Sequence, residues 1–268
     1  MTAARLPTYF ISHGGGPWPW MKDEMEDAYD GLEASLVRMP DEIGRTPRAV
    51  LMVSAHWEGP EFTLQTHPQP PMLYDYGGFP AATYQVRYPA PGAPALAQRV
   101  RALLSAAGIA SAEDAQRGYD HGTFVPMAVI YPQADVPLLQ LSLRRGLDPA
   151  QHVALGRALA PLRDEDVLVV GSGLSFHNLR LFGAPGAAPS AAFDRWLADT
   201  LAIADPVART RTLEAWAQAP AARLAHPREE HLLPLMVALG AAESDPATRV
   251  YHESAFFGDL TVSSYRFG

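Results

Sequence analysis

The chain has 268 residues, of which 48% are hydrophobic and 19% charged, a balance typical of a globular protein with a sizeable core. Its 29 acidic and 21 basic side chains give a net charge of −8, which argues against nucleic acids and anionic membranes as partners. The absence of cysteine excludes disulfides, thiolate zinc sites and cysteine nucleophiles. No apolar run reaches the roughly 18 residues of a membrane span, and residues 1–10 lack the apolar core of a signal peptide, so we expect a cytoplasmic protein.

The first half of the sequence alternates apolar runs with amphipathic segments. In chain order we expect a strand at 8–12, a helix at 23–39 that Pro40 ends, strands at 49–55 and 61–66, a helix at 93–107 and a strand-like piece from residue 109. The run AVLMVSA at 49–55 is continuously apolar, as in a buried parallel strand. Residues 68–92 are rich in Pro, Gly and Tyr and are too long for a simple connection, and such loops are often functional.

The second half continues this alternation. We expect a turn at 119–122, an apolar helix or strand at 123–131, a strand at 137–143, a helix at 149–162, a strand at 167–171, helices at 191–204, 206–217 and 227–239, and a strand at 259–267. Pro227 stands at the first position of its predicted helix, with Glu229 and Glu230 in the first turn. The alternation predicts one α/β domain over residues 1–268, with a central mostly parallel or mixed sheet flanked by helices on both faces.

Three of the nine histidines stand shortly after predicted strands. They are His13, His56 and His177, the last of which follows a short turn rich in Gly and Ser. Open α/β sheets bind ligands at the carboxyl ends of their strands, and neutral imidazole is the commonest metal ligand among side chains. Each histidine alone is more often structural than catalytic, but the set predicts a metal site over one edge of the sheet.

Other short patterns give weaker signals. The glycines at 14–16 do not have the G-x-G-x-x-G spacing of a nucleotide-binding loop. The turn at 171–173 lacks the G-x-S-x-G elbow of serine hydrolases. Asp120 either orients the neighbouring imidazole or caps the helix that follows. His226 and His231 stand five residues apart, so they do not share a helical face as the two histidines of H-E-x-x-H do.

Seven short motifs run in order along nearly the whole chain. They are Ser12-His13-Gly14, SAHWE at 54–58, DYGGFP at 75–80, YPAPG at 88–92, DHGTFVP at 120–126, GSGLSFHN at 171–178 and EHLLPL at 230–235. Together they resemble the class III extradiol ring-cleavage dioxygenases, specifically the DOPA 4,5-dioxygenase-like branch. The chain departs from that pattern at Gly15-Gly16, where Ser-Pro is expected.

The resemblance implies a mononuclear metal bound by His13, His56 and His231. Related extradiol enzymes hold ferrous iron with two histidines and one carboxylate. Glu230 stands beside His231 here, so whether this carboxylate joins the ligand set stays open. Fe(II) is the implied cofactor for activity. Zn(II) also suits three histidines, but it supplies no redox chemistry.

The resemblance also implies which residues act on the substrate. His177 is implied as the acid–base residue, which takes a proton from the substrate and later returns one. His121 is implied as a second catalytic residue in the pocket. His226, Tyr76 and Phe79 are implied to bind the substrate, the last two from the long Pro- and Tyr-rich segment.

The implied activity is cleavage of a catechol-type, DOPA-like ring by O2 to give a semialdehyde. The partners are then a small catechol and O2, with no nucleic acid and no membrane, and we expect a monomer or small homo-oligomer. Two other hypotheses stay open: three histidines with a bound water make a zinc hydrolase, and a non-catalytic binding protein can keep a fold whose chemistry is lost. Candidate partners for a substrate carboxylate are Arg87, Arg180 and Arg228.

Overall fold

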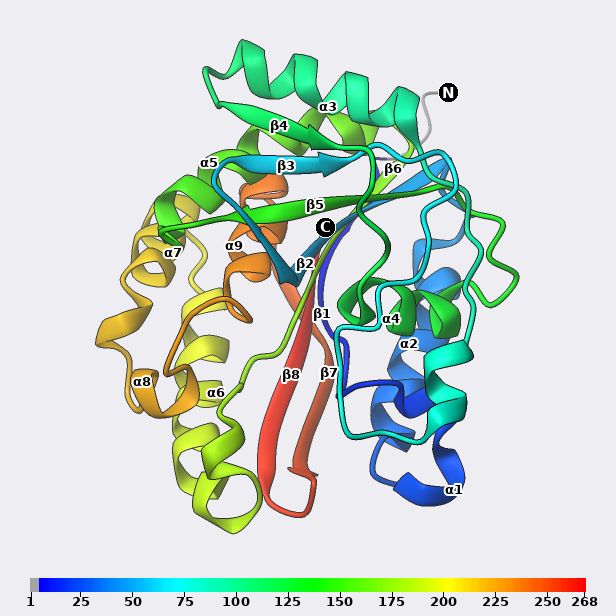
Figure 1. The fold of residues 1–268 in the computed structure, drawn as a ribbon. Coiled ribbons are helices and arrows are strands. Elements are labelled where there is room, and N and C mark those ends of the chain that lie inside the picture. Colours follow the sequence, from blue (N-terminus) through cyan, green and yellow to red (C-terminus); the bar gives the residue numbers. More distant parts are fainter. Residues whose placement is uncertain (1–4) are drawn as a thin grey trace.

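A mixed sheet of eight strands organises residues 5–268, the part of the chain that the computed structural model describes. The strand order is β4-β3-β5-β2-β6-β1-β8-β7. The strands are β1 (Thr8–Ser12), β2 (Ala49–Gly59), β3 (Phe62–Gln65), β4 (Ser111–Asp114), β5 (Leu138–Arg144), β6 (Val167–Gly173), β7 (Ala247–Phe256) and β8 (Leu260–Phe267). The sheet runs through the middle of the molecule (Figure 1), which confirms the predicted α/β class. The assignment of all of 1–268 to one catalytic domain stays a prediction.

The four central strands run parallel and end at the same edge of the sheet. β2 pairs in parallel with β5 and β6, and β6 pairs in parallel with β1. Every residue of β1 and β6 is buried, as expected for strands covered on both faces. A register shift between Val53 and Glu58 marks an irregularity in β2, so the strand continues past the predicted end at Ala55 and carries His56 within it.

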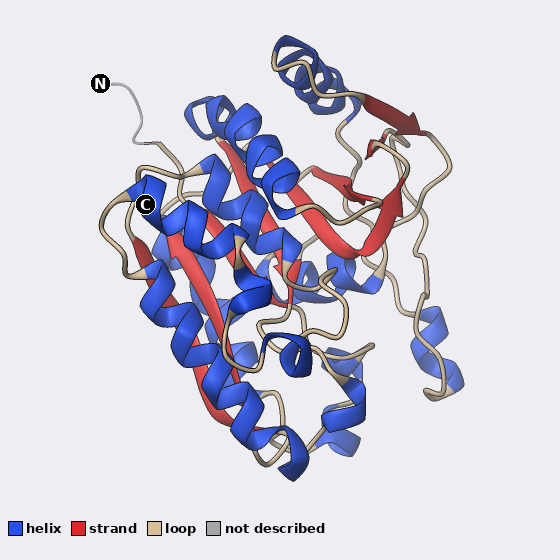
Figure 2. Cartoon of the chain, turned by 90° about the vertical axis from the view of Figure 1, so that its left-hand side faces the viewer, coloured by secondary structure: helices blue, strands red, loops and turns tan. Residues whose placement is uncertain are grey.

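Helices cover both faces of the sheet. They are α1 (Lys22–Met25), α2 (Asp30–Ile43), α3 (Pro94–Ala106), α4 (His121–Ile130), α5 (Pro149–Leu159), α6 (Ala187–Leu201), α7 (Pro206–Glu214), α8 (Ala222–Ala225) and α9 (Leu233–Ala241). α9 packs on β6, β1 and α5, whereas α4 packs on β2 and α2. Figure 1 shows α5, α7 and α9 to the left of the sheet and α2 and α4 to its right, and Figure 2 shows the first layer from the front. No described helix is both long enough and apolar enough to cross a bilayer.

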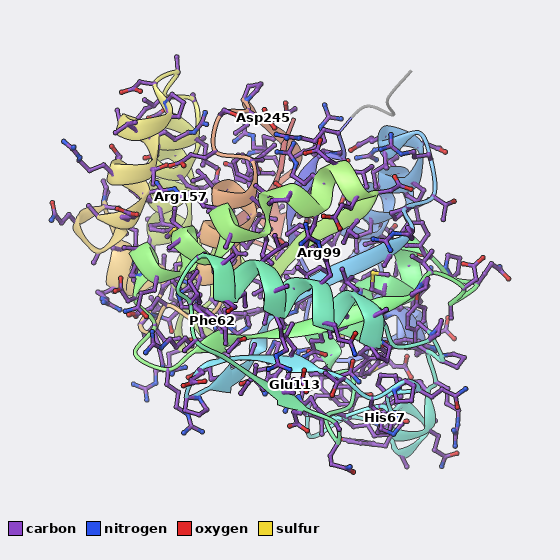
Figure 3. All side chains as sticks on the ribbon, turned by 90° about the horizontal axis from the view of Figure 1, so that it is seen from above. Phe62, His67, Arg99, Glu113, Arg157 and Asp245 are labelled. Carbon is purple, nitrogen blue, oxygen red and sulfur yellow. The ribbon has the colours of Figure 1, made fainter. Side chains whose placement is uncertain are left out.

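The predicted helix at 93–107 is confirmed as α3. It lies beside α5 over the sheet, as seen from above in Figure 3. Leu96, Val100 and Leu104 form its buried stripe. Arg99 on its outer side pairs with Glu165 at 2.6 Å, but solvent screens such an exposed pair, so it contributes little to stability. Apolar burial therefore fixes α3 in place.

The predicted helix at 23–39 is two helices, α1 and α2, separated by a turn at 26–29. α2 also continues through Pro40 instead of ending before it. Four apolar side chains are buried along one face of α2: Leu32, Leu36, Met39 and Ile43. The free energy gained by burying this stripe outweighs the loss of the backbone hydrogen bond that proline cannot donate. The sequence pattern does not predict β7, since most of its side chains are exposed or half-buried.

The predicted helix at 227–239 begins only at Leu233, because the preceding turn crosses the end of β6. The backbone N–H of Leu174 donates to the carbonyl of His231 at 3.1 Å. Gly173 allows this approach, since a Cβ at that position would lie 2.1 Å from the same carbonyl oxygen. The turn thereby brings His231 to the edge where the parallel strands end.

Candidate metal centre and active site

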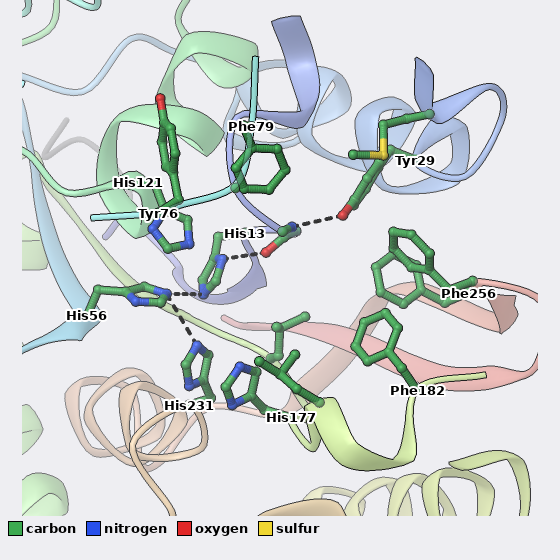
Figure 4. A pocket seen from close by; sticks show the side chains of 17 residues that line it. His13, Tyr29, His56, Tyr76, Phe79, His121, His177, Phe182, His231 and Phe256 are labelled. Carbon is green, nitrogen blue, oxygen red and sulfur yellow. Dashed lines mark hydrogen bonds between the residues drawn. The ribbon is translucent and has the colours of Figure 1, made fainter. Parts of the chain in front are cut away.

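Three histidines converge at the edge where the parallel strands end. His13 directly follows β1, His56 lies in β2 beyond its register shift, and His231 lies in the turn before α9. The Nε2 atom of His56 lies 3.2 Å from the Nε2 atoms of both other histidines, as the dashed lines in Figure 4 show. Two nitrogens bound to one ion at about 2.1 Å each lie about 3 Å apart. The observed spacing therefore fits three ligands of a single metal ion.

The other ring nitrogen of each histidine faces an oxygen. The Nδ1 atom of His13 lies 2.7 Å from the carbonyl oxygen of the next residue. The Nδ1 atom of His231 lies 3.0 Å from Oε1 of Glu230, and that of His56 lies 3.5 Å from Oδ2 of Asp75. These acceptors favour the proton on Nδ1 and leave a lone pair on each Nε2. The lone pair of His56 thus lies close to those of both other histidines, and a cation between them would stabilise this arrangement, so the donor set fits a metal.

Burial keeps the three imidazoles neutral. Removal from water lowers the pKa of His13, His56 and His231 well below its ordinary value, and the charge that neighbouring histidines acquire on protonation lowers it further. Because a metal binds only the deprotonated ring nitrogen, protons compete weakly for this site at neutral pH.

A pocket of about 390 Å³ opens beside the three Nε2 atoms. His121 and His177 both line it, as predicted for the two catalytic residues. The ring of His121 lies 3.9 Å from that of His56, measured between centroids, and the ring of His177 stacks on that of His231 at 3.4 Å. Figure 4 shows the two rings on different sides of the metal-ligating group. Two imidazoles thus flank the space in which a ligand of the metal would lie.

The predicted substrate-binding residues Tyr76 and Phe79 line the same pocket. The hydroxyl of Tyr76 donates to the carbonyl of Thr83 at 2.6 Å, so this residue offers its ring to the cavity. Phe79 packs against Gly16, which has a φ of +55°, and a Cβ on Gly16 would lie 2.4 Å from the phenyl ring. The glycine that stands in place of the expected proline therefore makes room for Phe79.

Two carboxylates lie near the Nδ1 atoms of the histidines. Oδ1 of Asp75 accepts hydrogen bonds from the backbone N–H of His121 at 2.9 Å and from its Nδ1 at 2.8 Å. Oε1 of Glu230 lies 3.0 Å from Nδ1 of His231 and 3.4 Å from Nδ1 of His177. Glu230 thus faces the Nδ1 side of the rings and positions them, while Nε2 faces the metal site. Sequence reasoning assigned no role to Asp75, although it begins the DYGGFP motif.

We expect Asp75→Ala to weaken metal binding about 10- to 100-fold, because it removes the acceptor behind His56 and the neighbouring His121. Asp75→Asn keeps an oxygen acceptor and should lose less. Metal dissociation constants from competition with a chromophoric chelator test this, with Asp41→Ala, an exposed position on α2, as the control. Unchanged affinity in Asp75→Ala would exclude the positioning role.

His226, predicted to bind substrate, is not among the residues that line the pocket. Its side chain is fully buried, with Nε2 3.0 Å from the carbonyl oxygen of Ser175. Its ring packs against those of Phe193 and Trp216, with centroids 5.2 and 6.0 Å away. The expected substrate contact is therefore not formed, and His226 supports the core behind the site. A motif match locates a residue along the chain but does not give the direction of its side chain.

Asp120 also differs from expectation. It occupies the N-cap position of α4, but its side chain caps no backbone N–H. The buried carboxylate instead accepts hydrogen bonds from Ser54 at 2.7 Å, from Arg117 at 3.0 Å and from Gln140. Burial raises the pKa of Asp120, while Ser54 and Arg117 partly oppose that shift. The network ties the start of α4 to β2 and β5, beneath the histidines.

Acidification should destabilise the metal-free protein partly through His226. Burial lowers the pKa of His226 from 6.5 to about 4, so between these pH values the unfolded chain binds more protons than the folded one. Stability is therefore lost as the pH falls below 6.5. From pH 7 to pH 5 this group alone contributes a loss of about 2 kcal/mol. Urea unfolding at both pH values tests this: His226→Gln, which keeps a donor for Ser175, should lose about 2 kcal/mol less than the wild type. Equal losses in the two proteins would contradict the prediction.

Similarity to known proteins extends over nearly the whole chain. Residues 7–268 match the family described as the catalytic LigB subunit of aromatic ring-opening dioxygenase. A 4,5-DOPA dioxygenase extradiol of Beta vulgaris is 40% identical over 269 residues, which cover 97% of this chain and 96% of that protein. The protein of the same description from Escherichia coli K12 is 34% identical over 273 residues, which cover 100% and 97%. The crystal structure of an uncharacterized Escherichia coli K12 protein superimposes with a TM-score of 0.80 at 30% identity, covering 98% of this chain and 100% of that one. The chain belongs to the LigB family of aromatic ring-opening dioxygenases.

Proposed function

We propose that this protein is a non-haem, Fe(II)-dependent extradiol dioxygenase that cleaves the ring of a DOPA-like catechol with O2 and forms a semialdehyde. The observation that carries the proposal is the convergence of three histidine Nε2 atoms at one end of a pocket wide enough for an aromatic ring. Family membership supports ring opening. The relatives described as 4,5-DOPA dioxygenase extradiol support a catechol that bears a side chain.

His13, His56 and His231 would hold the ion. Ferrous iron, when bound, supplies the redox chemistry that lets O2 react with the diol, which zinc does not. Because all three ligands are neutral, they leave the charge of the cation uncompensated and favour a diol that has lost a proton. Tyr76 and Phe79 would contact the substrate ring from the loop side of the pocket.

His177 and His121 would carry protons. The Nδ1 atom of His177 lies 3.4 Å from Glu230, which leaves Nε2 to take a proton from a diol hydroxyl and to return one during ring opening. The Nδ1 atom of His121 is held by Asp75 at 2.8 Å, so its Nε2 is likewise left for the substrate. Each carboxylate thus orients the ring that it faces, which suits a residue that accepts a proton in mid-reaction.

Anaerobic reconstitution with Fe(II), followed by O2 and a panel of catechols, tests the proposal. We expect one O2 consumed per catechol and a yellow product from the ring-opened semialdehyde. Zinc-loaded protein serves as the control and should consume no O2. No O2 uptake with any catechol would overturn the proposal, and ester hydrolysis by the zinc-loaded protein would then favour the hydrolase hypothesis. The cytoplasmic location and the monomer or small homo-oligomer stay predictions.

A further inference from the structure

We infer that the groove beside His177 is a subsite for a negatively charged side chain of the catechol, and that Arg180 is the residue that selects this side chain. The inference rests on the proposed function, since it concerns which catechol is held with its ring at the histidines. It commits to the carboxylate as the group that is recognised in a DOPA-like side chain.

The groove adjoins the pocket that the histidines line. It has a volume of about 390 Å³ and shares His177 and Leu179 with that pocket, in which Figure 4 shows His177 beside His231. Its other lining residues are Asn178, Arg180, Pro227, Arg228 and Glu230. Because His177 belongs to both cavities, a substituent on a ring bound beside it can extend from the pocket into the groove.

Charge is distributed unequally between the two cavities. No described residue that lines the pocket has a Lys, Arg, Asp or Glu side chain. The groove is lined by two arginines and one glutamate, in a protein whose net charge is −8. A carboxylate that left water for the pocket would lose its hydration without gaining a partner, whereas in the groove it would meet a cation. The groove is therefore the part of the site that suits an anionic side chain.

Of the two arginines in the groove, Arg228 is already paired. Its guanidinium donates two hydrogen bonds to the carboxylate of Glu58, at 2.5 and 2.6 Å, and lies 3.5 Å from Glu230. A bidentate pair of this kind occupies the guanidinium and compensates its charge. Arg87, the third arginine considered above as a carboxylate partner, lines neither cavity. Arg180 is therefore the cation that is available to a substrate.

Arg180 has a fixed backbone and an unpaired side chain. Its backbone N–H donates to Oδ1 of Asn178 at 3.0 Å, and Nδ2 of Asn178 donates to the carbonyl of Leu224 at 2.9 Å. Within residues 5–268, its guanidinium has no hydrogen-bond or ion-pair partner. A guanidinium presents its donors in a planar fork that matches the two oxygens of a carboxylate. Arg180 can thus bind a carboxylate without first breaking another ion pair.

The neighbouring residues suit the rest of such a side chain. Leu179 is 71% exposed and lines both cavities, so the methylene groups between ring and carboxylate can pack on it. The one carboxylate of the groove, Glu230, directs Oε1 toward the histidines, at 3.4 Å from Nδ1 of His177 and 3.0 Å from Nδ1 of His231. An apolar stem with an anionic end therefore matches Leu179 followed by Arg180.

Two catechols that differ mainly in charge test the inference. 3-(3,4-Dihydroxyphenyl)propionate and 3-(3,4-dihydroxyphenyl)propanamide have side chains of nearly the same shape, and only the first is anionic. With the Fe(II) enzyme we expect kcat/KM to be at least about tenfold higher for the propionate, mainly through KM, because a hydrogen bond between charged groups is the stronger one. DOPA should exceed dopamine, which lacks the carboxylate. Calorimetric binding to the zinc-loaded enzyme, in which no turnover occurs, should show the same order.

Variants of Arg180 supply the second test. Arg180→Gln removes the cation from an exposed side chain, so the fold should tolerate it. We expect the preference for the propionate over the propanamide to fall at least about fivefold, and Arg180→Lys to restore part of it. Arg38→Gln, at an exposed position on α2 outside both linings, removes the same unit of charge and should leave the preference unchanged. Each preference compares two substrates on one protein sample, so partial loss of folded enzyme does not alter it.

The outcomes separate the inference from the proposed function. Equal binding and turnover of the propionate and the propanamide would overturn the inference and leave ring cleavage standing. A preference that Arg180→Gln keeps in full would overturn the role of Arg180. Tighter binding of the propionate to the zinc-loaded enzyme, lost in Arg180→Gln and unaccompanied by O2 uptake in the Fe(II) enzyme, would support the subsite and overturn ring cleavage. Failure of both compounds to bind the zinc-loaded enzyme would overturn the inference.

Discussion

His56→Ala should abolish metal binding and ring cleavage together. His56 is the central one of the three proposed ligands, because its Nε2 lies 3.2 Å from that of each of the other two, and its loss leaves two nitrogens that no longer share a neighbour. We expect bound iron to fall below roughly a tenth of an equivalent per chain and kcat/KM to fall more than about a hundredfold. Metal analysis after reconstitution and an O2 electrode assay measure the two effects.

His252→Ala is the control for this variant. His252 lies on β7 with a side chain that is 38% exposed, and its Nδ1 lies 3.1 Å from the hydroxyl of Ser263. It should retain full metal content and activity. If His56→Ala bound a full equivalent of iron with wild-type affinity, the assignment of the three ligands would be incorrect.

His177→Ala should retain its metal but lose turnover. The ring of His177 stacks on that of His231, but it does not supply one of the three Nε2 atoms that converge. The metal content should therefore stay near that of the wild type. Loss of a positioned acid–base residue costs about 10²- to 10⁴-fold in kcat. Stopped-flow absorbance of the yellow product gives kcat, and metal analysis on the same samples gives occupancy.

A parallel variant, His121→Ala, identifies which histidine carries the proton. Both histidines line the pocket, and each has a carboxylate near its Nδ1. If His177 is the main proton carrier, His177→Ala should lose more kcat and should change the dependence of kcat on pH. A His177→Ala enzyme with the wild-type rate and pH profile would remove the assigned role.

The central strands were predictable because their apolar runs are continuous. β1, the first part of β2 and β6 are buried on both faces. Burial of this kind requires an almost continuous run of apolar residues, which solvent-facing strands such as β7 lack. Helix limits were less predictable because they depend on tertiary contacts. α2 continues past Pro40 because a stripe of its apolar side chains is buried. α9 begins later than predicted because the turn before it packs on the end of β6.

The site residues that could be predicted from the sequence pattern are those that closely follow a strand. Position after a strand indicated His13, His56 and His177, whereas His231 follows no strand, and its place in the ligand set came from the family resemblance. Asp75 lies in a long loop without a periodic pattern, and only the fold brings its carboxylate to 2.8 Å from an imidazole 46 residues away. Contacts of this range leave no local signal.

The three proposed ligands come from widely separated parts of the chain. One close Nε2 pair joins His13 and His56, which are 43 positions apart in sequence, and the other joins His56 and His231, which are 175 positions apart. A bound ion therefore closes two long loops in a protein that has no cysteine with which to form a covalent cross-link. Because the unfolded chain does not hold these ligands together, resistance to unfolding rises with the logarithm of free metal concentration above the dissociation constant. We therefore expect added metal to prolong the survival of the chain under heat and proteolysis, in addition to permitting turnover.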